Sequence, residues 1–104
     1  MAIIHCLGAG LVGSYVAKKL SDKGHEVHAH DLTTGDIFME YPEIIFHKGN
    51  VLESCKKIKK FGDFDIVVNM LPGEIGHSIM KILYSQGVNI VDLSFSEITP
   101  DALS

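Results

Sequence analysis

The sequence LGAGLVGSYV, residues 7–16, carries the spacing GxGxxG at Gly8, Gly10 and Gly13. A short apolar run, residues 3–7, precedes these glycines. From Leu11 onward, apolar residues recur about one helical turn apart. The stretch therefore predicts a strand that turns tightly into a helix.

The rest of the chain repeats this alternation of strands and helices. Strands are predicted at residues 26–31, 44–47, 65–71 and 89–93, and further helices at residues 50–61 and 75–86. Gly24 stands where a left-handed residue usually closes a helix, and Asn50 is a residue type favoured at helix N-caps. Residues 32–43 are assigned only a short helical turn before Pro42, and residues 96–104 a loop.

Strands that alternate with helices indicate a parallel sheet covered by helices on both faces. We expect an α/β chain with a three-layer Rossmann fold, whose sheet of about five strands has the order 3-2-1-4-5. The apolar stretch DIVVNML, residues 65–71, should be a central strand. With 104 residues, the chain is long enough for one such domain.

Composition excludes several classes of function. The net charge is −4, and the one lysine run, residues 56–60, is expected on the solvated side of a helix, so nucleic acid is not an expected partner. No leader or membrane span is recognisable, and Cys6 and Cys55 suggest buried thiols in a reducing compartment, so we expect a cytoplasmic protein. The chain has no arginine.

The glycine turn has the arrangement that binds the pyrophosphate of a dinucleotide. Gly8 allows the tight turn, Gly10 leaves room for the phosphates, and Gly13 lets the helix press against the sheet. Asp31, 23 residues after Gly8, is placed to accept hydrogen bonds from the adenosine ribose. Its charge disfavours a 2′-phosphate and residues 32–34 bring no cation, so NAD is expected and NADP is less favoured. The alternative is a structural turn with an incidental aspartate.

Two further contact zones follow from the expected topology. Leu71, Pro72 and Gly73 come after the fourth strand and should face the crevice, although proline and glycine there can also simply end the strand. Asn50 and Val51, after the third strand, should lie near the adenine, but Asn50 fits a plain helix cap equally well.

The histidines give no site of their own at this stage. His28 and His30 share one face of a strand, but no further ligands complete a metal set, so surface or half-buried imidazoles are expected and no metal is assigned. His77, near the start of the helix after the fourth strand, is not given a catalytic role.

A family resemblance rests on the stretch DFDIVVNMLPGEIGHSIMKILYSQGVNIVDLSF, residues 63–95. Its Pro-Gly before a helix and its VDLSF segment resemble the N-terminal nucleotide-binding half of the saccharopine dehydrogenase family, particularly lysine dehydrogenase-like members. The matching positions are Leu71, Pro72, Gly73, Gly76, Gly87, Val88, Val91, Asp92, Ser94 and Phe95, and LGAGLVG matches the family's start.

This resemblance implies an NAD(P)-dependent oxidoreductase acting on the CH–NH or CH–NH2 group of an amino acid such as lysine or saccharopine. It implies cofactor contacts at Gly8, Gly10, Leu11, Val12, Asp31, Leu71, Pro72 and Gly73, with Ser94 and Phe95 near the nicotinamide. The family's substrate and acid–base groups lie beyond the fifth strand, so no catalytic residue is assigned. We expect residues 1–104 to be the N-terminal dinucleotide-binding fragment of a longer enzyme, inactive alone.

One alternative is a non-catalytic NAD-sensing module like the regulatory domains of potassium-uptake systems, which share the fold and the acid after the second strand. The Pro-Gly and VDLSF segments favour the dehydrogenase. A sheet that ends at the fifth strand exposes an edge, and a second copy of the chain is one candidate to cover it as a homodimer.

Overall fold

A computed structural model describes residues 1–8, 11–32, 41–71 and 73–93 of the chain. Five parallel strands form one sheet in the order β3-β2-β1-β4-β5. The strands are β1 (Ile3–Leu7), β2 (Glu26–Asp31), β3 (Ile45–Lys48), β4 (Ile66–Asn69) and β5 (Ile90–Asp92). The predicted α/β Rossmann-like fold and strand order are confirmed.

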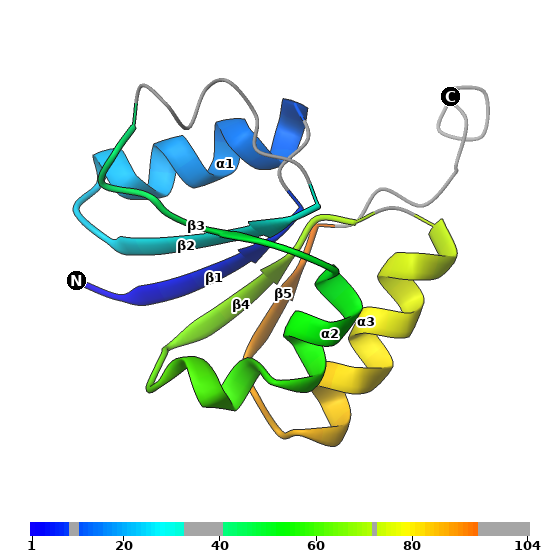
Figure 1. The fold of residues 1–104 in the computed structure, drawn as a ribbon. Coiled ribbons are helices and arrows are strands. Elements are labelled where there is room, and N and C mark those ends of the chain that lie inside the picture. The colour runs from blue at the N-terminus through cyan, green and yellow to red at the C-terminus, as the bar shows by residue number, and fades with distance from the viewer. Residues whose placement is uncertain (9–10, 33–40, 72, 94–104) are drawn as a thin grey trace, which may run out of the picture.

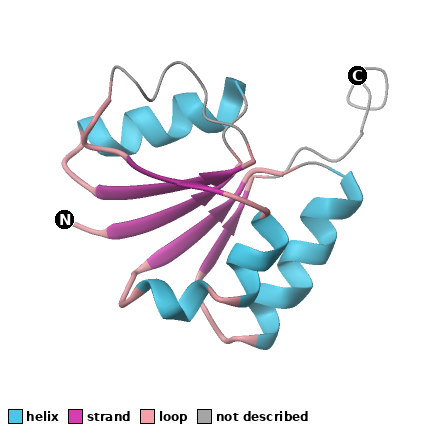
Figure 2. Cartoon of the chain, viewed as in Figure 1, coloured by secondary structure: helices cyan, strands magenta, loops and turns pink. Residues whose placement is uncertain are grey.

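Helices cover both faces of the sheet (Figures 1 and 2). Helix α1 (Leu11–Asp22) lies on one face, while α2 (Val51–Lys56) and α3 (Gly73–Ser85) lie on the other. A short 3₁₀ helix, η2 (Ile58–Phe61), follows α2. None of the helices in the described ranges is both long and apolar enough to cross a membrane.

The alternation of side chains along β1 separates two apolar cores. Ile4 and Cys6 point into the core under α1, where they pack with Ala17 of that helix. Leu7 points to the opposite face, into a core filled from α2, η2 and α3 by Val51, Cys55, Ile58, Ile79 and Leu83. Both cysteines are fully buried free thiols, and burial raises the pKa of each to about 12.

Several local predictions are confirmed. Gly24 follows α1 with φ 89°, and Gly62 follows η2 with φ 97°. The Asn50 side chain accepts the N–H groups of Leu52 and Glu53, so it caps α2. Lys56, Lys57, Lys59 and Lys60 are all exposed, as predicted, but they are divided between α2 and η2 because the backbone leaves the α conformation at Lys57.

One prediction about strand 4 needs correction. Strand β4 ends at Asn69 rather than at residue 71, because the Asn69 side chain takes the Leu71 N–H out of the ladder. In the helix that follows, Ile75 is 42% exposed. The buried face is set by Gly76, Ile79 and Leu83, and Ile75 lies about 100° away from Gly76 around the helix. The predicted turn before Pro42 lies largely, and the predicted loop at residues 96–104 wholly, outside the described residues.

Candidate functional site

The carboxyl end of β1 and the start of α1 form a closely packed turn. Gly8 has φ 105°, and its N–H donates to the carbonyl of His30 at 2.9 Å. A Cβ atom placed on Gly13 would lie 2.3 Å from the carbonyl oxygen of Gly8, closer than any real contact. Only glycine therefore fits at position 13, and the helix begins directly against the strand end. The N–H groups of the first turn of α1, which starts at Leu11 and Val12, have no partner within the helix and can receive phosphate oxygens.

Strands β2 and β3 end side by side next to this turn. Asp31 closes β2, and one of its carboxyl oxygens accepts the Leu32 N–H at 2.6 Å. Its backbone carbonyl accepts the Gly49 N–H at 2.8 Å. In the register of the two strands Asp31 pairs with Lys48, which is exposed. Residues 32–34 contain no cation, as the sequence shows, but the register of β2 with β3 also places Lys48 next to Asp31.

Asn50 and Val51 follow β3 at the same edge of the sheet. The Asn50 side-chain oxygen accepts N–H groups of α2 at 2.9 and 3.4 Å, so the helix-cap alternative is confirmed. The Val51 side chain is only 5% exposed and packs in the core under α2 and α3. A contact between Val51 and adenine remains a prediction, and little of that side chain faces outward to make it.

The carboxyl end of β4 lies at the same end of the sheet as those of β1, β2 and β3. A Cβ atom on Gly8 would lie 3.2 Å from the Leu71 side chain, so the ends of β1 and β4 touch where the strand order reverses. Gly73 begins α3 with φ 63°. Asn69 is fully buried, accepts the Leu71 N–H at 3.2 Å and donates to the Gly76 carbonyl at 3.1 Å. This role of Asn69 was not predicted from the sequence. A polar amide within an otherwise apolar strand could have indicated it.

The predicted cofactor residues divide into two groups. Gly8, Asp31, Asn50, Val51, Leu71 and Gly73 meet at the carboxyl edge of the parallel strands, with Leu11 and Val12 at the adjoining helix start. Gly10, Pro72, Ser94 and Phe95 lie outside the described residues. The predicted contacts that can be located thus fall at one edge of the sheet, as the topology requires for a dinucleotide.

The histidines are arranged differently from expectation. His28, whose side chain is 12% exposed, agrees with the expected surface or half-buried imidazoles, whereas His30 is fully buried. They contact His5 and His47, two histidines that no sequence pattern singled out. His77 is exposed on α3. Within the described ranges, no three or more His, Cys, Asp or Glu side chains are grouped so as to hold a metal ion.

The model of the saccharopine dehydrogenase NADP binding domain family matches residues 4–104. The chain belongs to this family. It is therefore a nicotinamide dinucleotide-binding domain of a family of oxidoreductases. No curated protein sequence matches the chain.

Solved structures share the fold of this saccharopine dehydrogenase family domain. Apo saccharopine dehydrogenase (L-glutamate-forming) from Saccharomyces cerevisiae is 19% identical, with a TM-score of 0.69 over 99% of the chain and 23% of the yeast enzyme. UDP-glucose 4-epimerase from Thermotoga maritima is 19% identical, with a TM-score of 0.62 over 86% of the chain and 37% of the epimerase. The C-terminal domain of a Pyrococcus furiosus hydrogenase is 18% identical, with a TM-score of 0.63 over 88% of the chain and 90% of that domain.

Proposed function

We propose that residues 1–104 are the dinucleotide-binding part of an oxidoreductase that acts on the C–N bond of an amino acid such as lysine or saccharopine. The observation that carries the proposal is the shared edge of Gly8, Asp31 and Leu71 beside the start of α1, in a chain of this family. The chain spans 23% of the yeast enzyme's length. The groups that hold the amino acid belong, in this proposal, to a part of the enzyme outside residues 1–104.

For the cofactor, we propose that NAD binds in preference to NADP, although the matching family is named for NADP. The Asp31 carboxylate can accept both adenosine ribose hydroxyls, and it repels a 2′-phosphate at the same place. Lys48 acts in the opposite direction. Its ammonium group is exposed, and an exposed ion pair contributes only about 0–1 kcal/mol, so the carboxylate should decide the preference.

Calorimetric titration of the folded chain with NAD and with NADP tests this proposal. We expect tighter binding of NAD, and Asp31→Ala should weaken it about 10- to 100-fold, because hydrogen bonds to a charged group contribute roughly 1.5–3 kcal/mol. Lys48→Met is the matched control, since it removes the neighbouring charge from β3 and should leave NAD affinity within about threefold.

Two results would contradict the proposal in different ways. If the folded chain binds neither nucleotide at millimolar concentration, the glycine turn is structural. If the wild-type chain prefers NADP and Lys48→Met abolishes that preference, the lysine rather than Asp31 selects the cofactor.

A further inference from the structure

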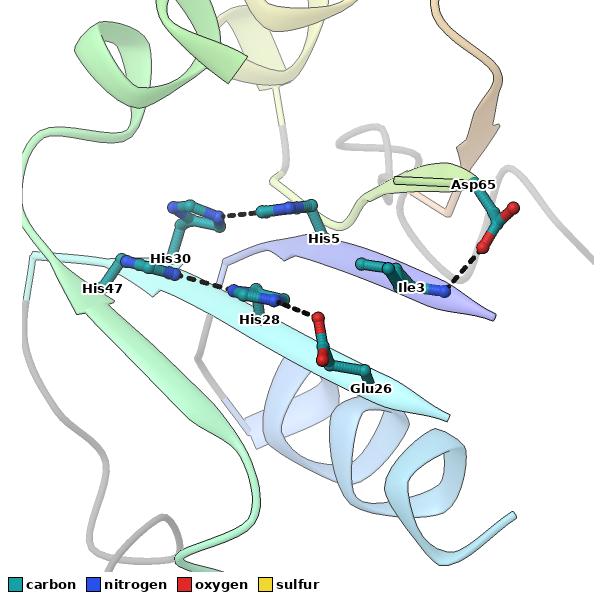
Figure 3. A network of polar contacts seen from close by, with 7 residues as sticks. All are labelled: Ile3, His5, Glu26, His28, His30, His47 and Asp65. Carbon is teal, nitrogen blue, oxygen red and sulfur yellow. Dashed lines mark hydrogen bonds and ion pairs between the residues drawn. The ribbon is translucent and has the colours of Figure 1, made fainter. Parts of the chain in front are cut away.

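Four histidines from three neighbouring strands lie together on one face of the sheet (Figure 3). His5 of β1 and His30 of β2 approach each other through Nδ1 and Nε2 at 2.8 Å, and His28 of β2 approaches His47 of β3 in the same way at 2.9 Å. The ring centroids of these pairs are 5.1 and 5.2 Å apart, which exceeds each N···N distance by about two ring radii. The rings of each pair therefore lie edge to edge, joined by a hydrogen bond.

The two pairs stack on each other. The His5 ring lies over that of His28, with centroids 4.4 Å apart and planes inclined by 19°. The His30 ring lies over that of His47, at 4.6 Å and 16°. Together they form a two-by-two array, which we call the histidine array. Phe61 of η2 packs edge-on against His30 and His47 and tilts over His5, and Phe64 packs edge-on against His5, so aromatic rings cover part of the array.

The hydrogen bonds of the array can all form between neutral imidazoles. When His28 is neutral and donates from Nε2 to Glu26 at 2.9 Å, its Nδ1 accepts the hydrogen bond from His47. Each N–H···N contact holds one shared proton, so a further proton on a pair must go to an outer ring nitrogen. In the inner pair, His5 Nε2 and His30 Nδ1 are buried and have no partner. A charge on either ring would gain no hydrogen bond there.

The surroundings disfavour protonation as well. Burial is the main cause that lowers the pKa of His5 to about 4 and of His30 to about 3, and it also lowers the pKa of His47. The other imidazoles of the array lower these pKa values further, whereas the Glu26 carboxylate acts in the opposite direction on His5. The helical side presents Phe61 to the array, and the neighbouring Lys59 and Lys60 are exposed.

A metal ion does not explain this arrangement. Coordination by two imidazoles needs lone pairs that converge on one point beside the rings. Here the paired nitrogens face each other along the line between the ring centroids, and the two buried free nitrogens lie on the outer sides of the inner pair. The array is thus built to hold shared protons rather than a cation.

The array lies on the same strands that end at the candidate nucleotide site. The His30 carbonyl accepts the Gly8 N–H of the glycine turn, and Asp31 follows His30 directly. His47 is followed by Lys48 and by Gly49, whose N–H bonds to Asp31. We propose that the histidine array is a pH-sensitive element, in which protonation below neutral pH separates β1, β2 and β3 and thereby opens the nucleotide-binding edge. This inference rests on the proposed dinucleotide function for its consequence, but not for its mechanism.

The direction follows from linkage. The pKa values of His5, His30 and His47 are lowered in the folded chain from the ordinary histidine value of about 6.5. The stability they contribute is complete above that pH and is lost progressively as the pH falls toward the lowered values. For each proton taken up on opening, the equilibrium constant for opening increases by up to about tenfold as the pH falls by one unit.

The first test measures NAD affinity by calorimetry at about pH 7.5 and about pH 5.5, a range in which histidine titrates and NAD, lacking a 2′-phosphate, does not. We expect the wild-type affinity to fall at least about tenfold. The double variant His5→Leu/His30→Leu replaces both inner partners by apolar groups and should lose less than about threefold. His25→Asn is the control, because His25 lies outside the array and its Nδ1 accepts the Ala2 N–H, a bond that the asparagine side-chain oxygen can also accept. It should behave as wild type.

The second test needs no nucleotide. Amide hydrogen exchange at Gly8 and Gly49, corrected for the intrinsic rate, should show opening that increases at least about tenfold over the same pH range in the wild type and not in the double variant. If the double variant does not fold, His47→Gln takes its place. In that variant, the increase in amide opening between about pH 7.5 and about pH 5.5 should be smaller than in the wild type. Absence of NAD binding at neutral pH would refute the proposed function alone. Equal pH dependence in wild type and array variants, or none in the wild type, would overturn the array's role.

Discussion

At the scale of single residues, Gly13 fixes how closely α1 approaches the sheet. A methyl group there would meet the backbone oxygen of Gly8, which cannot rotate away as a side chain can. We expect Gly13→Ala to lower the free energy of unfolding by about 3 kcal/mol, the upper part of the range for overpacking, and to weaken NAD binding. Urea unfolding and calorimetry measure the two effects.

Gly24→Ala provides the matched control for Gly13→Ala. Gly24 has a positive φ, 89°, unlike Gly13, but no atom lies within 4 Å of the place that a methyl group would take, so only backbone strain of about 1–2 kcal/mol applies. NAD affinity should be unchanged in this variant. Similar effects of the two substitutions on both stability and affinity would mean that the contact with Gly8 relaxes freely.

At the scale of elements, Asn69 joins the end of β4 to the first turn of α3. Its amide satisfies the Leu71 N–H and the Gly76 carbonyl, and the residue is fully buried. Asn69→Ala leaves both backbone groups without that partner, so we expect a loss of about 2–4 kcal/mol in unfolding free energy. Asn89→Ala serves as the control, because Asn89 is exposed and its one 3.3 Å bond should contribute less than about 1 kcal/mol. Equal losses in the two variants would contradict the role given to Asn69.

The helices and strands could be predicted from the sequence because the residues that start and end them lie close together in the chain. Glycines at positions 8, 24 and 62 mark turns through their backbone freedom, and Asn50 marks a helix start within three residues of its partners. The end of β4 was placed two residues too late, since the apolar run continues past the point where Asn69 diverts the backbone. Composition alone cannot show that diversion.

The contacts between different strands could not be predicted as well from the sequence. Lys48 lies next to Asp31, and His47 contacts His28, only because of the register of β2 with β3. The register depends on where β3 begins, and the segment before that strand carries little periodic signal. His5 contacts His30, 25 residues away, through the register of β1 with β2. The candidate nucleotide site at the carboxyl ends of the strands was thus predicted from sequence motifs. The position of Lys48 beside that site and the histidine array could be found only from the three-dimensional structure.

At the scale of the whole molecule, β5 leaves one edge of the sheet without a neighbouring strand in the described part of the chain. Val91 and Leu93 on and after this strand are 38% and 42% exposed. An exposed apolar edge is a surface that another strand or chain can cover. A homodimer through this edge stays a prediction, and in the proposed function a further part of the enzyme would compete for the same surface.

In the proposed function, catalytic turnover depends on groups outside residues 1–104. Hydride transfer needs the amine carbon to be held against the nicotinamide in a water-poor pocket, and such positioning contributes about 7–11 kcal/mol to lowering the barrier. The chain has no arginine to hold an amino-acid carboxylate, and its lysine run is exposed. Of the described histidines, those of the array are directed toward each other or toward Glu26 rather than toward the glycine turn.

We therefore expect NADH absorbance to stay at background when the purified chain is mixed with NAD and lysine, saccharopine or related amino acids. The same preparation must bind NAD by calorimetry, so that a silent assay reflects missing substrate groups and not a missing cofactor. Substrate-dependent NADH formation that is reduced by Asp31→Ala would place catalytic groups within residues 1–104. It would contradict the proposal that these residues bind the cofactor while the substrate is bound elsewhere in the enzyme.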